Sequence, residues 1–215
     1  MALTEHYYTK FECNKFYHVY NRSVDRKPLF KSKNNYIYFL KRYDEYLLEY
    51  VDTYAYCLLG NHFHLLILIK DLTTFQKLSN LQSNKEQKSA HDIVSHQFKK
   101  FFQSYAMAFN KQQDRIGTLF QTPFKRVLVE NHKYIENTIT YIHKNPEHHG
   151  LVDDFREWEW SSYHRILIDK VSKLKKKEVL AIYDSKEKFK ESHTIGKIDI
   201  PEDLLFYEEE SFENH

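Results

Sequence analysis

Glycine and proline are scarce in this chain, with four of each among 215 residues. This scarcity argues against a loop-rich β-sandwich and against a glycine-rich nucleotide-binding fold, because both need residues with unusual backbone freedom. The sequence contains neither a G-x-G-x-x-G pattern nor a Walker A pattern. A nucleotide-binding function of either type is therefore not predicted.

Cysteines and long apolar segments are also rare. Cys13 and Cys57 are the only cysteines and neither belongs to a C-x-x-C pair, so no disulfide framework is expected. A reducing cytoplasm is the expected compartment. The apolar run "LLILI" at 65–69 is far too short to span a bilayer, and the N-terminus has no apolar signal region. We therefore expect a cytoplasmic protein without a membrane partner.

The formal net charge is only +2, but the charges are unevenly distributed along the chain. The last fifteen residues contain six acids and no lysine or arginine, so 32 basic and 24 acidic residues precede them, a net charge of +8. A positive balance of this kind is compatible with a surface that binds nucleic acid.

The pattern of apolar residues predicts the order strand, helix, strand, strand, helix, strand. The segments are a strand at 15–23, a helix at 33–50, strands at 52–59 and 62–69, a helix at 91–110 and an extended segment at 117–130. This order is the split β-α-β pattern of a ferredoxin-like antiparallel sheet, an α+β fold. Asn131 is a candidate N-cap for a third helix that Pro146 should end. We expect helices on one face of the sheet and the third helix across the central strand 62–69.

Two histidines interrupt an otherwise apolar strand in "LLGNHFHLLILI" at 58–69. In an extended chain His62 and His64 point to the same face, while Phe63 points to the other. Two adjacent neutral imidazoles are a ready pair of metal ligands. The structural alternative is that both histidines only form hydrogen bonds with neighbouring residues.

The third predicted helix contains "TYIHKNPEHHG", in which Tyr141 and Asn145 lie one helical turn apart on the same face. Two imidazoles and an amide oxygen suit Mg²⁺ or Mn²⁺. Such an ion would help the hydroxyl of Tyr141, whose ordinary pKa is about 10, to attack a phosphodiester. Tyr134, two turns earlier, is the rival nucleophile in this helix. Tyr141 is one of 17 tyrosines, so the prediction depends on the combination of motifs.

Several motifs occur here in the order seen in single-tyrosine HUH transposases. They are "YHVYNRS", "YAYCLLGNHFHLLI", "GTLFQTPFKRVLVENHKYIENTITYIHKNPEHHGLV" and "WEWSSYH". The chain most resembles the REP-associated tyrosine transposases, which are related to the smallest insertion-sequence transposases. The resemblance covers about residues 14–165 and predicts a domain over 1–165, followed by a charged helical extension with an acidic tail over 166–215.

The resemblance implies a transposase that binds single-stranded or hairpin DNA and cuts one strand by transesterification, leaving a 5′-phosphotyrosine. By that match Tyr141 is the nucleophile, and His62, His64 and Asn145 are ligands of Mg²⁺ or Mn²⁺. Related insertion-sequence enzymes carry glutamine in place of Asn145, so His143 or a water remain alternative third ligands. A homodimer, formed through edge-strand pairing near "FKRVLV", is also expected.

Polar and basic residues around these motifs are candidate DNA contacts, because cations neutralise phosphates while aromatic side chains stack on unpaired bases. They are Arg22, Asn61, Lys111, Arg115, Lys125 and Arg126. Two other functions stay open. The chain could be a domesticated hairpin-binding protein that does not cleave, or a metal phosphoesterase that uses water. The extension could brace the domain, bind DNA through "KLKKK" or contact a second subunit.

Overall fold

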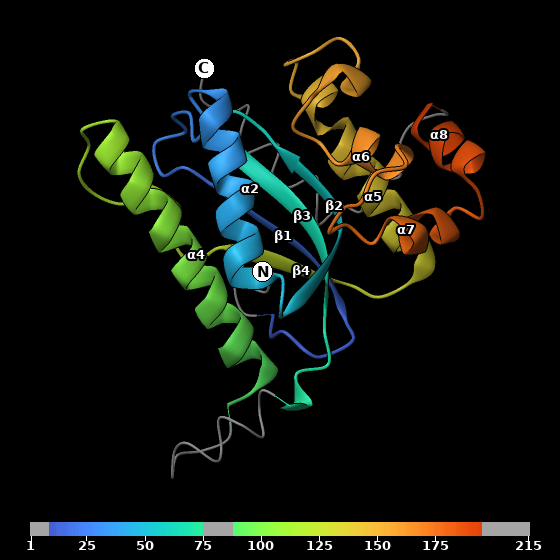
Figure 1. The fold of residues 1–215 in the computed structure, drawn as a ribbon, viewed down its shortest axis with the longest axis horizontal. Coiled ribbons are helices and arrows are strands. Elements are labelled where there is room, and N and C mark those ends of the chain that lie inside the picture. The colour runs from blue at the N-terminus through green and yellow to red at the C-terminus, as the bar shows by residue number, and fades with distance from the viewer. Residues whose placement is uncertain (1–8, 75–87, 195–215) are drawn as a thin grey trace, which may run out of the picture.

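The computed structural model describes residues 9–74 and 88–194. The acidic tail and most of the polar segment 71–89 lie outside the described residues. Figure 1 shows the main elements along the chain. In chain order they are β1 (Phe16–Arg22), α2 (Lys33–Leu47), β2 (Val51–Leu58), β3 (His62–Ile69), α4 (Ala90–Gln112), β4 (Lys125–Val129), α5 (His132–His148), the 3₁₀ helix η2 (Phe155–Glu157), α6 (Tyr163–Leu167), α7 (Lys176–Ile182) and α8 (Lys186–Thr194).

The strands form one four-stranded antiparallel sheet in the order β2-β3-β1-β4. This order is that of a split β-α-β fold, so the predicted ferredoxin-like α+β class is confirmed. β3 and β1 occupy the centre, and the residues of the His-x-His motif therefore lie on an inner strand. Tyr20 of β1 pairs directly with His64 of β3.

Helices cover both faces of the sheet (Figure 1). α2 and α4 pack together on one face, where Phe63 of β3 contacts Phe39 of α2 and Phe102 of α4. α5 lies across β2 and β3 on the opposite face, where Tyr141 contacts His64. Successive residues of β3 thus point to different helices, as strand geometry requires. The expected helix pair on one face and the third helix across the histidine strand are both present.

α5 begins as predicted but ends later. The side chain of Asn131 accepts a hydrogen bond from the backbone N–H of Tyr134 at 2.8 Å and caps the helix. The prediction that Pro146 ends the helix is wrong, because Pro146 lies inside α5 and His149 is the C-cap. Proline fits the helical φ angle and only its lost N–H and its ring disfavour the interior. The chain leaves the helix at Gly150, which has a positive φ of 63°.

The segment after residue 165 packs against the same face as α5. Val179 and Tyr183 at the end of α7 and Phe189 of α8 are buried in one apolar cluster with Ile139 and Ile142 of α5. This segment also covers the outer edge of β2, since Leu174 forms a parallel bridge with Thr53. The proposed domain boundary at residue 165 stays a prediction, but it runs through a shared hydrophobic cluster. Within the two described ranges, no helix has the length and apolar character needed to cross a membrane.

Replacing Phe189 with alanine should lower the free energy of unfolding by about 3–5 kcal/mol, because a fully buried aromatic side chain is lost and a cavity remains. Lys190→Ala, at an exposed position on the same helix, should change it by less than about 0.5 kcal/mol. Urea unfolding of both variants measures the difference. Equal stability of the two variants would show that α8 does not dock on this cluster.

Candidate active site

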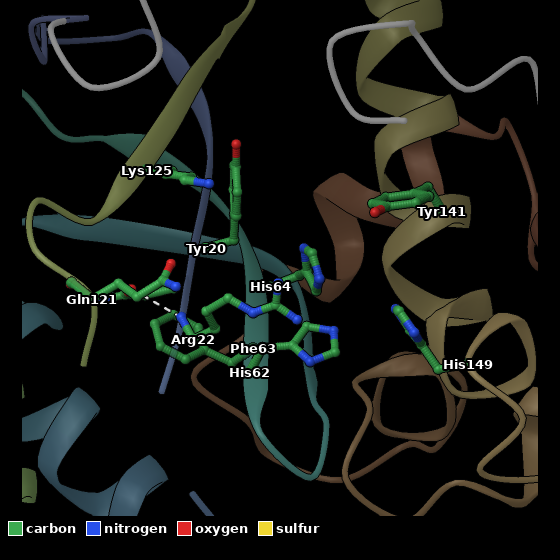
Figure 2. A pocket seen from close by; sticks show the side chains of 10 residues that line it. Tyr20, Arg22, His62, Phe63, His64, Gln121, Lys125, Tyr141 and His149 are labelled. Carbon is green, nitrogen blue, oxygen red and sulfur yellow. Dashed lines mark hydrogen bonds between the residues drawn. The ribbon is translucent and has the colours of Figure 1, made fainter. Parts of the chain in front are cut away.

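A hollow lies between the central strands and α5 (Figure 2). Residues of β1 and β3, of the segment before β4, of the start of β4, and of α5 with its C-cap line it. Its lining residues are Tyr20, Asn21, Arg22, His62, Phe63, His64, Gln121, Lys125, Tyr141 and His149. The pocket therefore combines the predicted histidines and tyrosine with two cations.

His62 and His64 lie side by side on the α5 face of β3, with ring centroids 5.2 Å apart. Burial, with the neighbouring histidines and Arg22, holds the pKa of both imidazoles well below the usual value for histidine. Both rings are therefore neutral near pH 7 and each retains a lone pair. A neutral imidazole is the form that binds a metal ion.

Tyr141 points from α5 toward these histidines (Figure 2). Its ring is nearly perpendicular to that of His64, with centroids 5.7 Å apart, and only 3% of its surface is exposed. The rival Tyr134 is not one of the residues that line the pocket. The structure thus brings together Tyr141, His62 and His64, residues that are almost 80 positions apart in the chain, since β3 and α5 pack across one face of the sheet.

Asn145 lies one turn after Tyr141 and is buried, but it does not form part of the pocket wall. Its Nδ2 donates to the backbone carbonyl of Tyr141 at 2.9 Å. Its Oδ1 is buried and has no hydrogen-bond partner in the described part of the chain. A buried amide oxygen without a partner is costly, and a cation is one group that would satisfy it.

His143, the alternative third ligand, points away from the pocket. Its Nδ1 lies 2.8 Å from Nε2 of His193 and its Nε2 lies 2.7 Å from Oγ of Ser162. Both ring nitrogens are therefore engaged in a buried network that connects α5 with α8 and with the start of α6. This network excludes His143 as the substitute ligand.

His149 is a pocket residue that the sequence reasoning missed. It follows the last residue of α5, two turns after Tyr141, and its ring centroid is 4.8 Å from that of His62. Burial, with His148 and Arg22, lowers its pKa to about 4. His149 follows Asn145 by four residues, as Asn145 follows Tyr141. A predicted helix that continued past Pro146 would therefore have placed His149 on the same face as Tyr141.

The candidate DNA contacts are divided between the pocket and other parts of the surface. Arg22 and Lys125 line the pocket. Arg126, the next residue, is 5% exposed, and its guanidinium lies 5.2 Å from the ring centroids of both Phe11 and Phe124. Cation–π packing of this kind favours a structural role for Arg126 over a phosphate contact.

The remaining candidate contacts lie outside this pocket or already have partners. Arg115 donates to Oδ1 of Asn110 at 2.8 Å and lines a separate hollow beside the loop after β1. Lys111 is exposed near the end of α4. Asn61 donates from Nδ2 to the carbonyl of Arg26, and its Oδ1 lies 2.6 Å from Nδ1 of His62. DNA binding by these residues stays a prediction.

The donor set fits a divalent cation without forming a closed metal site. Over the residues that the structure describes, no three His, Cys, Asp or Glu side chains come together as a metal centre. The fit depends instead on the neutral imidazoles of His62 and His64, which line the pocket. The unpartnered Oδ1 of Asn145 is a further oxygen donor, but it lies outside the pocket wall. Mixed nitrogen and oxygen donors of this kind suit Mn²⁺ and Mg²⁺ sites that leave positions open for a phosphate.

A four-stranded antiparallel sheet with a histidine pair opposite a helical tyrosine is the arrangement that the resemblance to single-tyrosine HUH transposases predicted. No family model matches the chain. A Haemophilus influenzae protein assigned to the REP-associated tyrosine transposases is 30% identical over 116 residues. The aligned part covers 53% of this chain and 60% of that relative, so the chain spans less than two thirds of it.

A solved structure of a REP-associated tyrosine transposase bound to a REP hairpin has the same fold, with a TM-score of 0.53. The match has 16% sequence identity and covers 74% of this chain and 82% of that chain. The resemblance to the REP-associated tyrosine transposases is therefore confirmed by a sequence relative, and the solved structure shows the same fold.

Proposed function

We propose that this protein is a transposase of the REP-associated type, which cuts and rejoins single-stranded DNA beside hairpins through Tyr141. The observation that carries the proposal is the placement of the Tyr141 ring against His64, in a pocket that Arg22 and Lys125 also line. The two relatives support the same function, since one is assigned to these transposases and the other is bound to a REP hairpin.

The proposed reaction is a transesterification at one phosphodiester. The phenolic oxygen of Tyr141 loses its proton and bonds to phosphorus, while the bond from phosphorus to the 3′-oxygen breaks and that oxygen gains a proton. The products are a DNA end joined to Tyr141 through its 5′-phosphate and a free 3′-hydroxyl. Attack by that hydroxyl on the phosphotyrosine bond reseals the original strand, and attack by another 3′-hydroxyl joins the attached end to a different strand. Neither reaction needs an external energy source.

The residues proposed to hold a divalent cation, Mg²⁺ or Mn²⁺, are His62, His64 and Asn145. When bound, the cation would offset the negative charge that develops on the phosphate oxygens. Arg22 and Lys125 would hold the DNA backbone over Tyr141, because both cations lie in the same pocket.

Covalent capture tests the proposed function. The wild-type chain is incubated with single-stranded hairpin oligonucleotides in Mn²⁺ or Mg²⁺, with label at either the 5′ or the 3′ end. We expect an adduct that survives denaturation. It should be labelled only with the 3′-labelled oligonucleotide, because the fragment on the 3′ side of the cut is joined to the protein through its 5′-phosphate. Hairpin binding without cleavage would support the domesticated binding protein, whereas cleavage without an adduct would support a hydrolase that uses water.

We also propose that the protein forms a symmetric homodimer through β4. β4 lies at one edge of the sheet, and its ladder within the described residues is with β1 alone. An edge strand can pair with its own copy across a two-fold axis. Light scattering at micromolar concentration should give twice the chain mass, and Leu128→Pro on β4 should reduce it to one chain mass because proline cannot donate to the ladder. A wild-type monomer would contradict this proposal.

The cytoplasm is the proposed compartment. Cys13 and Cys57 are both free thiols in the structure, and Cys57 is buried. A reducing compartment keeps such thiols free.

A further inference from the structure

The two histidines of β3 share one feature, a hydrogen bond at the same ring nitrogen. Nδ1 of His62 lies 2.6 Å from Oδ1 of Asn61. Nδ1 of His64 lies 2.9 Å from Nε2 of His18, a buried residue of the neighbouring strand β1. In each ring Nε2 is therefore the nitrogen left for the pocket. The two partners come from different elements, so the shared pattern does not follow from the His-x-His spacing.

The contacts of Asn61 fix the proton of His62. Nδ2 of Asn61 donates to the backbone carbonyl of Arg26 at 2.9 Å, which orients the amide and directs Oδ1 toward His62. An amide oxygen can only accept a hydrogen bond. Nδ1 of His62 must therefore carry the proton, and Nε2 carries the lone pair.

The contact of His18 also occupies Nδ1 of His64, and His64 carries its proton there when Nε2 of His18 is the acceptor. His18 is 1% exposed, and its ring stacks on that of His64 with centroids 5.1 Å apart and an angle of 14° between the rings. His18 pairs with Leu66 across the ladder, so it lies diagonally opposite His64 on the same face of the sheet. A polar ring on a central strand is costly to bury unless it forms a hydrogen bond. His64 provides that bond.

We infer that His18 and Asn61 are positioning residues, which hold His64 and His62 in the Nδ1–H form so that both bind a divalent cation through Nε2. This inference rests on the metal site of the proposed function. Partners at the second ring nitrogen fix the tautomer and orientation of a ligating histidine, and their loss usually costs about 10- to 100-fold in metal affinity. Neither residue touches the metal itself in this arrangement.

The first test reads the tautomers directly, without metal. In the full chain labelled with ¹⁵N-histidine, nitrogen chemical shifts distinguish a protonated from an unprotonated ring nitrogen. We expect His62 and His64 to be protonated at Nδ1, and His18→Phe to change the signal of His64 but not that of His62. Protonation of either ring at Nε2 in the wild-type chain would overturn the inference.

The second test measures the affinity for Mn²⁺ by calorimetry in two matched variants. His18→Gln places an amide oxygen near the position of Nε2, whereas the shorter side chain of His18→Asn does not reach His64. We expect affinity within a few-fold of wild type for His18→Gln and a loss of about 10- to 100-fold for His18→Asn. At Asn61, alanine should weaken binding and aspartate, which keeps the acceptor oxygen, should not.

Thermal unfolding and hairpin affinity of the same variants separate positioning from folding. A structural role alone would lower the unfolding temperature of His18→Asn while its Mn²⁺ affinity stayed at the wild-type value, and that result would overturn the inference. If the wild-type chain itself does not bind Mn²⁺, the proposed metal site fails. In that case the tautomers measured without metal still decide whether His18 and Asn61 orient the two rings.

Discussion

Replacing Tyr141 with phenylalanine should abolish the covalent adduct with hairpin DNA and reduce cleavage to background. The change removes one oxygen and keeps the ring that packs at 5.7 Å against His64. Loss of a nucleophile costs on the order of 10⁴-fold or more in rate. Folding and hairpin affinity should stay near the wild-type values, because the ring remains and so do Arg22 and Lys125, the cations proposed to contact phosphate.

Tyr134→Phe is the matched control for this experiment. It makes the same chemical change on the same helix, two turns earlier and outside the pocket. This variant should cut and form the adduct at close to the wild-type rate. Mass spectrometry of the wild-type adduct should place the DNA on Tyr141. Attachment to any other residue would contradict the assignment, even if Tyr141→Phe were inactive.

Replacing both His62 and His64 with alanine should abolish cleavage that depends on Mg²⁺ or Mn²⁺ and leave hairpin binding largely intact. Both proposed imidazole ligands are lost together, whereas Arg22 and Lys125 remain in the pocket to hold the backbone. The dissociation constant for the hairpin, measured by fluorescence anisotropy without metal, should change only a few-fold. Adduct formation and calorimetric titration with Mn²⁺ should both fall to background.

The matched control for the double variant removes two histidines elsewhere. His96 on α4 and His132 at the start of α5 are exposed and lie outside the pocket. The variant His96→Ala with His132→Ala should therefore cut and bind metal like wild type. Normal metal-dependent cleavage by the variant in which alanine replaces both His62 and His64 would show that these residues are not the metal ligands. Loss of hairpin binding in that variant would instead show that the histidines contact DNA.

Local patterns predicted most of the fold because they depend on neighbours in the chain. The alternation in β3 correctly turned Phe63 away from His62 and His64, and Asn131 was correctly predicted as an N-cap. The same alternation, applied to β4, would have predicted that its two basic residues lie on opposite faces of the sheet. Lys125 and Arg126 are adjacent in a strand, so they point to opposite faces and only one of them can line the pocket.

Features that depend on tertiary packing could not be predicted in this way. The helix continued past Pro146 because packing of α5 outweighed the local cost of proline, and His149 was missed as a consequence. The contact between His18 and His64 depends on the register of two strands that are not consecutive in sequence. The spacing of residues within one segment does not determine how two strands align, so this contact could not be predicted from it.

The covered edge of β2 limits how copies of this chain can associate. Leu174 bridges to Thr53 and Ser161 bridges to Cys57, so the segments around α6 occupy that side of the sheet. In the part of the chain that the structure describes, β4 is then the remaining edge strand of the sheet. A subunit that can pair through only one edge strand has no second edge for another copy once a dimer has formed. Among the described residues, pairing through β4 would therefore stop at two copies and would not extend into an open-ended fibre.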